Sequence, residues 1–344
     1  MLRAIAALMV VALHACIQAG PFGGRPFPLG NAGVDIFFPI SGFVMVVSTE
    51  GRAASFGAAG RFALARILRI VPIYWLVSAV KVTLMAVRPG SLAPLGIKAI
   101  AGALLFIPLH LSSGELAYPP VKPGWTLNLE MSYYLLIVAV MPFSRRIAVW
   151  TPLAIIGVVT ASRLAAPHFP PLTGELGWGS PLALEFAAGM ILGQLTLSRA
   201  WRGRWPLLAL AAGLAIYAFA PTSAGSNEWT RALGWGVPGL LFLWAAVGAE
   251  PFLRAGGWTR IPKLLGDASY SIYLTHALTQ PIITAALGRQ IVSFAGWPAF
   301  VAVQIIAPTL MAVAFHKLVE RPLTRGLKSR LTLPATRRPV AAQA

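Results

Sequence analysis

The residues of this sequence best suited to chemistry are ionisable side chains that lie in or beside long apolar stretches. His14 follows Arg3 by eleven residues, which is close to three helical turns. Both side chains would therefore share one helix face, about 16 Å apart along the axis. Histidine titrates near neutral pH and can accept a proton. The alternative is a neutral His14 bonded to a neighbouring helix, with Arg3 as a topology anchor.

Arg66 and Arg69 stand three residues apart, so a helix would present both guanidinium groups on one face. Each guanidinium offers a planar fork of donors that suits the oxygens of a phosphate. On spacing alone, however, the sequence favours a second interpretation. In it, the two arginines anchor a membrane helix on its cytoplasmic side.

Two carboxylates also lie in apolar stretches, where a charge is unfavourable unless it is paired or hydrated. Asp35 needs a histidine or an arginine from another helix. Glu130 follows Trp125 and shares a helix face with Tyr133 and Tyr134, which predicts a polar stripe. Such a stripe can line a sugar site, in which aromatic rings stack on pyranose faces and a carboxylate accepts hydroxyl hydrogen bonds. It can equally be a packing network between helices, or an aromatic belt at the interface.

Near the C-terminus, Tyr270, Tyr273 and His276 recur every three residues and follow one slowly drifting helix face. His276 is thus a second imidazole within an apolar stretch, and the three residues are candidates for substrate binding. Glu320 and Arg321, which precede a proline, predict instead a local cytoplasmic ion pair at a helix end.

The elements that must position these residues are transmembrane helices. The 344 residues are 57% hydrophobic and only 11% charged, whereas a soluble domain carries about a quarter charged residues. The apolar stretches lack a polar face, so their surface must face lipid. Ten stretches are long enough to predict spans, near 2–19, 33–49, 67–87, 126–143, 147–165, 181–197, 206–221, 232–249, 268–287 and 297–316.

The basic residues orient this all-α bundle. If residues 96–111 do not fully cross, most Lys and Arg lie on the cytoplasmic side, as the positive-inside bias requires. Both termini are then cytoplasmic, and residues 96–124 form an outer loop with a re-entrant or interfacial piece. We expect residues 1–330 to form one membrane domain and residues 331–344 to form a disordered cytoplasmic tail.

The net charge of +18 would suggest nucleic acid as the partner of a soluble protein. Here the basic residues lie in short segments between spans, where they orient the chain and meet anionic lipid or substrate. Cys16 is the only cysteine, which excludes an internal disulfide and a cysteine metal site. We therefore expect membrane lipids as partners, no nucleic acid, no metal and no bound cofactor.

Six pieces of the sequence, taken in order, resemble acyltransferase family 3, the integral-membrane acyltransferases that modify bacterial surface and exported glycans. They span nearly the whole chain and comprise residues 2–14, residues 33–43, Arg66 and Arg69 with Pro72 and Tyr74, and residues 125–130, 270–276 and 320–322. Residues 105–108 and 124–131 are similar to the branch associated with exopolysaccharide acetylation.

The resemblance implies a ten-span protein of the bacterial inner membrane. It implies transfer of an acyl group, expected to be acetyl, from cytoplasmic acyl-CoA to a glycan or a lipid-linked saccharide. In the family, the residues that match Arg3 and His14 are regarded as essential, and the pair that matches Arg66 and Arg69 as a donor-binding element. Proteins of polysaccharide assembly are further expected partners.

The resemblance also suggests a mechanism. We expect His14 to take the proton of the attacking hydroxyl, because an imidazole can act as a base at neutral pH. Asp35 or Glu130 would orient or polarise it. The phosphates of acyl-CoA would meet the three arginines, and the acceptor would approach from the outer half through Trp125, Glu130 and Tyr133.

Two other functions fit the same composition. A transporter or flippase for a lipid-linked saccharide would also combine ten spans, intramembrane charges and aromatic cavities. Such proteins tend to show two related halves, and this sequence shows no corresponding pair of interrupted helices. A non-catalytic membrane partner within a polysaccharide assembly complex is the third interpretation, and it predicts that His14 and the arginine pair are dispensable.

Overall fold

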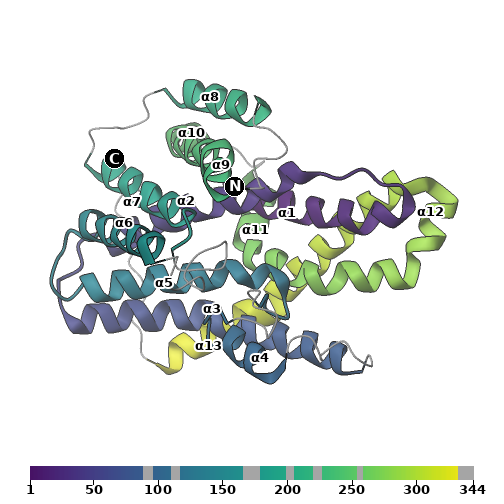
Figure 1. The fold of residues 1–344 in the computed structure, drawn as a ribbon, viewed down its shortest axis with the longest axis horizontal. Coiled ribbons are helices and arrows are strands. Elements are labelled where there is room, and N and C mark those ends of the chain that lie inside the picture. The colour runs from purple at the N-terminus through teal and green to yellow at the C-terminus, as the bar shows by residue number, and fades with distance from the viewer. Residues whose placement is uncertain are drawn as a thin grey trace.

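Every regular element in the computed structural model is a helix, for the residues that it describes: 1–87, 96–109, 117–165, 179–198, 205–219, 227–253 and 259–331 (Figure 1). The helices are α1 (Leu2–Ala19), α2 (Ala32–Thr49), α3 (Phe56–Ala86), α4 (Gly96–Leu104), α5 (Trp125–Val140), α6 (Ile147–Ala165), α7 (Ala183–Leu197), α8 (Pro206–Phe219), α9 (Glu228–Arg231), α10 (Val237–Leu253), α11 (Arg260–Asp267), α12 (Ser269–Phe315) and α13 (Arg321–Arg330). Short 3-10 turns are η1 (Gly20–Phe22), η2 (Pro28–Asn31) and η3 (Lys122–Gly124), and π-helical turns are η6 (Ala232–Gly236) and η8 (His316–Glu320). The all-α prediction is thereby confirmed for these residues.

Within the described residues, six helical segments are long and apolar enough to cross a membrane. They are Leu2–Phe22, Pro28–Thr49, Phe56–Ala86, Ile147–Ala165, Glu228–Glu250 and Ser269–Arg330. The apolar helices α7 and α8 are shorter, with 15 and 14 residues. The chain is therefore a multi-pass membrane protein, in which helices satisfy the backbone hydrogen bonds that lipid cannot. The number of ten spans stays a prediction.

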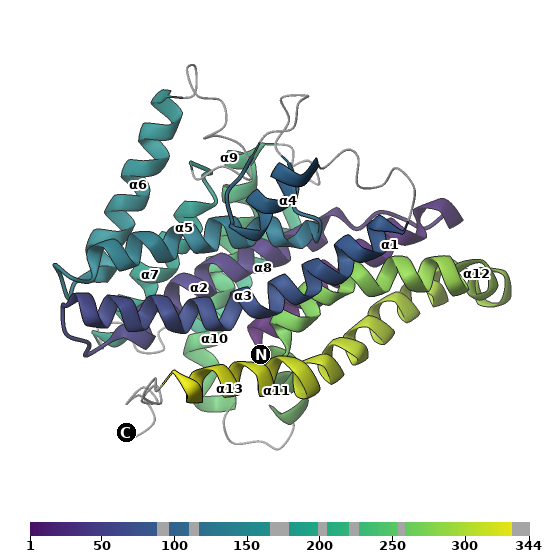
Figure 2. The same cartoon turned by 90° about the horizontal axis from the view of Figure 1, so that it is seen from below.

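The long helix α12 doubles back on itself, as Figures 1 and 2 show. Its helical path is interrupted at Gly296, whose φ of 78° lies in a region that glycine adopts without steric cost. Across the hairpin, the Gln280 side-chain amide donates to the Gln304 carbonyl at 3.0 Å, and the Gln304 amide donates to the Gln280 carbonyl at 3.1 Å. The predicted spans 268–287 and 297–316 correspond to the two arms.

The stretch of residues 96–111 forms the nine-residue helix α4, which covers about 14 Å and is too short to cross a bilayer. It packs on α3, where the Tyr74 hydroxyl donates to the Ala103 carbonyl and the Trp75 indole donates to the Leu104 carbonyl. Several predicted features lie outside the described residues. They are part of the predicted outer loop at 110–116, the basic residues at 199–204 and Arg254, and the predicted tail beyond Leu331. The orientation of the termini stays a prediction.

Helices α2 and α7 cross with their backbones in direct contact. A Cβ atom added to Gly42 would lie 2.0 Å from the Phe186 carbonyl oxygen, and one added to Gly189 would lie 2.0 Å from the Pro39 carbonyl oxygen. Small residues of this kind allow helices in membranes to pack closely by van der Waals contact. This crossing fixes α2, which carries Asp35.

Helix α1 lies between α2 and α12. Its contact with α2 is also close, because a Cβ atom on Gly33 would lie 2.4 Å from the Ala6 carbonyl oxygen. On the other side, the Gln280 side-chain amide of α12 donates to the Val11 carbonyl at 2.9 Å. The polar residues of α1 are thus held between two helices that carry other candidate site residues.

The α2–α7 crossing predicts a strong effect of one added methyl group. Gly189→Ala should lower the free energy of unfolding by roughly 1–3 kcal/mol, because the new Cβ overlaps a backbone oxygen that cannot move alone. The measurement is the melting temperature of the purified protein in detergent. Gly157→Ala in α6 is the matched control, since no atom lies within 4 Å of the added Cβ. Equal melting temperatures for the two variants would contradict the prediction.

Candidate active site

A small, partly open cavity of about 50 Å³ lies between α1, α2, α5 and α12, and we call it the central cavity. It is lined by Arg3, Val34, Phe37, Phe38, Ser41, Thr126, Leu127, Glu130, Ser269, Tyr270 and Tyr273. The structure therefore brings together Arg3, Glu130, Tyr270 and Tyr273, which the sequence predicted from three separate observations.

Arg3 is fixed at the start of α1 by contacts to two other helices. Its Nε donates to the Ser269 hydroxyl at 3.1 Å, and its guanidinium lies 5.8 Å from the centre of the Phe37 ring. Nearby, the Tyr270 hydroxyl donates to the Ile70 carbonyl at 2.8 Å. These contacts leave a cationic group on the cavity wall where an anionic substrate can meet it.

Glu130 accepts a hydrogen bond from the Ser41 hydroxyl at 3.2 Å and a short one from the Tyr134 hydroxyl. Tyr134 lies four residues after Glu130, so the two side chains share a face of α5. The sequence placed both Tyr133 and Tyr134 on this face, because positions three and four residues away both lie close to a given helix face. Of the two, only Tyr133 was predicted as a site residue, and spacing alone could not choose between them.

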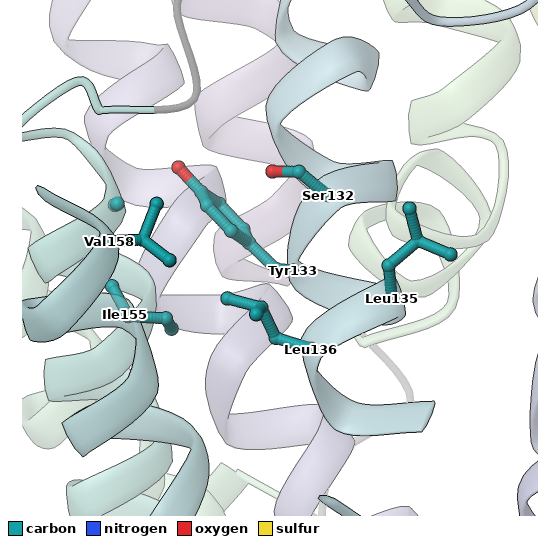
Figure 3. A pocket seen from close by; sticks show the side chains of 7 residues that line it. Ser132, Tyr133, Leu135, Leu136, Ile155 and Val158 are labelled. Carbon is teal, nitrogen blue, oxygen red and sulfur yellow. The ribbon is translucent and has the colours of Figure 1, made fainter. Parts of the chain in front are cut away.

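Tyr133 points away from the central cavity. Its ring lies 4.7 Å from the Phe186 ring, and it lines an apolar pocket between α5, α6 and α7 with Ser132, Leu136 and Ile155 (Figure 3). Its buried hydroxyl has no hydrogen-bond partner within the described part of the chain. The structure thus separates Tyr133 from Glu130, the residue with which the sequence grouped it.

Asp35 forms a buried ion pair with Arg231, with N–O distances of 2.9 and 3.1 Å. The two side chains are 0% and 5% exposed. The guanidinium also lies 5.7 Å from the ring centre of Trp125 and 5.6 Å from that of Trp235. The expectation that Asp35 needs a histidine or an arginine from another helix is confirmed, and Trp125 is placed against that arginine.

Two members of this buried cluster escaped the sequence analysis. Arg231 follows Glu228 in a short polar stretch and cannot be told from an ordinary loop cation by its neighbours. Glu185 lies in an apolar run and is 6% exposed, with neither carboxylate oxygen hydrogen-bonded among the described residues. The criterion that singled out Asp35 and Glu130, a carboxylate within a predicted span, would have found Glu185.

His14 and His276 lie against each other, with ring centres 4.9 Å apart and ring planes at 57°. The Nδ1 atom of His14 is 2.9 Å from the Val10 carbonyl oxygen. The orientation of His14 therefore comes from its own helix, whereas Asp35 and Glu130 bond to other groups. Tyr273 links the imidazoles to the central cavity, since its ring lies 6.2 Å from that of His276 and also lines the cavity.

Arg66 and Arg69 are in different surroundings although they share a helix. Arg66 donates to the Ser48 hydroxyl at 3.0 Å and lies 5.8 Å from the centre of the Tyr134 ring. Arg69 is exposed. Lys328 of α13 interacts electrostatically with both arginines, which makes this end of the bundle strongly basic. Neither spacing nor a motif in the sequence predicts Lys328 at this position.

Glu320 does not form the expected local pair with the adjacent Arg321. Its carboxylate pairs with Nδ1 of His316 at 2.8 Å and accepts a hydrogen bond from the Ser271 hydroxyl at 2.5 Å. The prediction was wrong because adjacent residues point in different directions on a helix, whereas residues four apart share a face. The helix also continues after Glu320 as α13.

Residues 1–316 match a family described as an acyltransferase domain, named Acyl_transf_3. The chain belongs to acyltransferase family 3. It is therefore an acyltransferase, and the resemblance of its six sequence pieces is confirmed. The matched range of this acyltransferase includes every candidate site residue discussed here except Glu320 and Lys328.

Two curated proteins are similar to this acyltransferase along most of its length. The exopolysaccharide production protein ExoZ of Rhizobium meliloti (strain 1021) is 35% identical over 321 residues, which cover 89% of this chain and 93% of that protein. The acyltransferase MdmB of Streptomyces mycarofaciens is 26% identical in an alignment 379 residues long. This alignment covers 99% of this chain and 92% of that protein. No solved structure matches the chain.

The buried ion pair predicts a large loss of stability when one partner is removed. Arg231→Gln should lower the free energy of unfolding by about 3–5 kcal/mol, because the Asp35 carboxylate is left buried without a counter-charge. Arg163→Gln is the control, since Arg163 pairs with Glu228 but is 34% exposed and should contribute less than about 1 kcal/mol. Melting curves in detergent measure both. If Asp35→Asn fails to restore stability to Arg231→Gln, the assigned cause is incorrect.

Proposed function

We propose that this acyltransferase transfers an acyl group, expected to be acetyl, from acyl-CoA on the cytoplasmic side of the bacterial inner membrane. The acceptor is a hydroxyl of an exopolysaccharide or of its lipid-linked precursor. The observation that carries the proposal is the central cavity, where Arg3, Glu130, Tyr270 and Tyr273 meet beside the two imidazoles. Similarity to an exopolysaccharide production protein over 93% of its length supports the class of acceptor.

His14 is the proposed general base. A carbonyl oxygen only accepts hydrogen bonds, so its bond with Val10 places the hydrogen on Nδ1 and leaves a lone pair on Nε2 of the neutral ring. That lone pair can take the proton of a hydroxyl as its oxygen attacks the thioester carbonyl. The thiolate that leaves with the electrons of the C–S bond is then protonated, and free CoA is released.

The donor would bind at the basic end of the bundle. Arg69 is exposed, Arg66 lies beside it, and Lys328 adds a third positive charge. Guanidinium groups bind phosphate oxygens through charge-assisted hydrogen bonds, which suits the phosphates of CoA. Arg3 lies on the cavity wall and interacts electrostatically with Arg69, so it can meet the donor further inside.

The acceptor would approach the partly open central cavity and insert a hydroxyl-bearing edge into it. Glu130 can accept hydroxyl hydrogen bonds, and the rings of Tyr270 and Tyr273 offer faces for a pyranose. Trp125 would act through its contact with Arg231, and Asp35 would act by holding that arginine in place. We assign Tyr133 to helix packing, because it lines the apolar pocket instead.

The proposal predicts release of CoA when purified protein receives acetyl-CoA and an acceptor. Oligosaccharide units of the host exopolysaccharide, stripped of ester groups with alkali, serve as the acceptor. His14→Ala should lower the rate at least about 100-fold, the usual contribution of a general base. Cys16→Ala, two residues later on α1, is the control and should leave the rate unchanged. Wild-type protein that moves the saccharide across vesicles without releasing CoA would favour a transporter.

The donor site predicts a selective change in affinity. Arg69→Gln should raise KM for acetyl-CoA by roughly 5- to 10-fold, as expected when an exposed phosphate contact worth about 1 kcal/mol is lost. The KM for the oligosaccharide acceptor should stay the same. Arg61→Gln is the control, because Arg61 is also exposed on α3 but lies more than two turns away. An equal rise in both variants would indicate only a general effect of charge.

A further inference from the structure

His276 is a fully buried histidine with an unused nitrogen. The residue is 0% exposed, and its Nδ1 lies 3.0 Å from the Ile272 carbonyl oxygen one turn earlier. Because a carbonyl accepts only, Nδ1 carries the hydrogen, and Nε2 of the neutral ring holds a lone pair. Nε2 is buried and has no hydrogen-bond partner in the described part of the chain. An unsatisfied acceptor in the interior costs free energy and requires an explanation.

The neighbouring His14 has the same internal arrangement. Its Nδ1 is bonded to the Val10 carbonyl, so its Nε2 is also a hydrogen-bond acceptor. The two rings are 4.9 Å apart between centres, which is close enough for ring nitrogens to come within hydrogen-bond distance. Two acceptors cannot bond to each other directly. One added proton changes this, because an Nε2–H on one ring can donate to the lone pair of the other.

The two rings differ in their access to the reaction space. His14 is partly exposed, whereas His276 is 0% exposed. A substrate hydroxyl can therefore reach His14 but not His276. The added proton would arrive on His14, and His276 would be the acceptor.

We propose that His276 is a positioning residue that stabilises protonated His14 during acyl transfer. This inference rests on the proposed role of His14 as the base. When the acceptor oxygen attacks the thioester carbonyl, its O–H bond breaks and an N–H bond forms at Nε2 of His14. Nε2 of His276 accepts a hydrogen bond from this new N–H. The proton later passes from His14 to the thiolate of the departing CoA, which returns both rings to the neutral state.

The surroundings of the two rings offer few groups that could accept a hydrogen bond from protonated His14. Lys122 of η3 interacts electrostatically with His14, but an ammonium group only donates hydrogen bonds and cannot accept one from His14. Tyr273 lies beside His276, but its hydroxyl is 3.1 Å from that of Thr126 and is already engaged. Asp35 is paired with Arg231. His276 is thus the acceptor that the described contacts leave available to His14.

The helices that carry the pair are locked at the same level. Gln280, one turn after His276, donates to the Val11 carbonyl. Val11 follows Val10, whose carbonyl is bonded to His14. The same side-chain amide donates to the Gln304 carbonyl on the second arm of α12. The spacing between the rings is therefore set by backbone contacts, and a small change at position 276 should leave it intact.

Two conservative variants separate the nitrogens of His276. In His276→Asn the short amide reaches the position of Nδ1 and can keep the bond to Ile272, but nothing replaces Nε2. In His276→Gln the longer side chain can place its amide oxygen, an acceptor, near the position of Nε2. CoA release from acetyl-CoA and the de-esterified oligosaccharide gives kcat and both KM values for the full-length protein in detergent. Melting temperatures confirm that each variant is folded.

We expect His276→Asn to lower kcat by about 10- to 100-fold while both KM values change less than about twofold, and His276→Gln to recover a large part of the loss. Full kcat in His276→Asn would overturn the inference while the proposed function stands. Equal losses in Asn and Gln, or a loss carried by KM, would also overturn it, since they indicate packing or substrate binding. If wild-type protein releases no CoA, the proposed function fails and takes the inference with it.

Discussion

Each polar side chain within this bundle has to find its partner inside the protein, because the surrounding lipid supplies none. Asp35 meets this constraint through Arg231, and Glu130 meets it through Ser41 and Tyr134. The Asp35–Arg231 pair joins α2 to α9, and the Ser41–Glu130 bond joins α2 to α5, so both connect helices that are distant in sequence. The polar contacts therefore do much of the positioning that apolar packing does in soluble proteins.

The same constraint identifies the groups that are available for substrates. The carboxylates that looked most catalytic in the sequence are largely occupied by structural partners, as with Asp35, or lie on the cavity wall, as with Glu130. Among the described residues, His14 and His276 form hydrogen bonds only through Nδ1, to their own helices. The proposed chemistry therefore lies at the α1–α12 contact, while α2 and α5 supply walls of the central cavity.

Much of this arrangement was predictable from the sequence, because apolar length and helical spacing are local properties. From them we predicted the all-α class, a stretch at 96–111 that does not fully cross the membrane, and a histidine or arginine partner for Asp35. Spacing defines a helix face but does not say which neighbour lies on it, so Arg66 and Arg69 were grouped although one is exposed. Arg231 becomes the partner of Asp35 because α2 packs against both α7 and α10. Those contacts come from glycines far apart in the chain, such as Gly42 and Gly189.

The hairpin of α12 has a consequence for the biogenesis of the protein. Gln280 and Gln304 are 24 positions apart, so closing this loop is inexpensive in entropy. The two arms can partition into the bilayer together with their side-chain N–H groups already hydrogen-bonded. The bond from Gln280 to Val11 spans 269 positions and has to wait for nearly the whole chain to leave the ribosome. A nascent polypeptide therefore carries one imidazole from the beginning but gains the second only as translation ends. Prematurely terminated chains insert without a complete reaction centre.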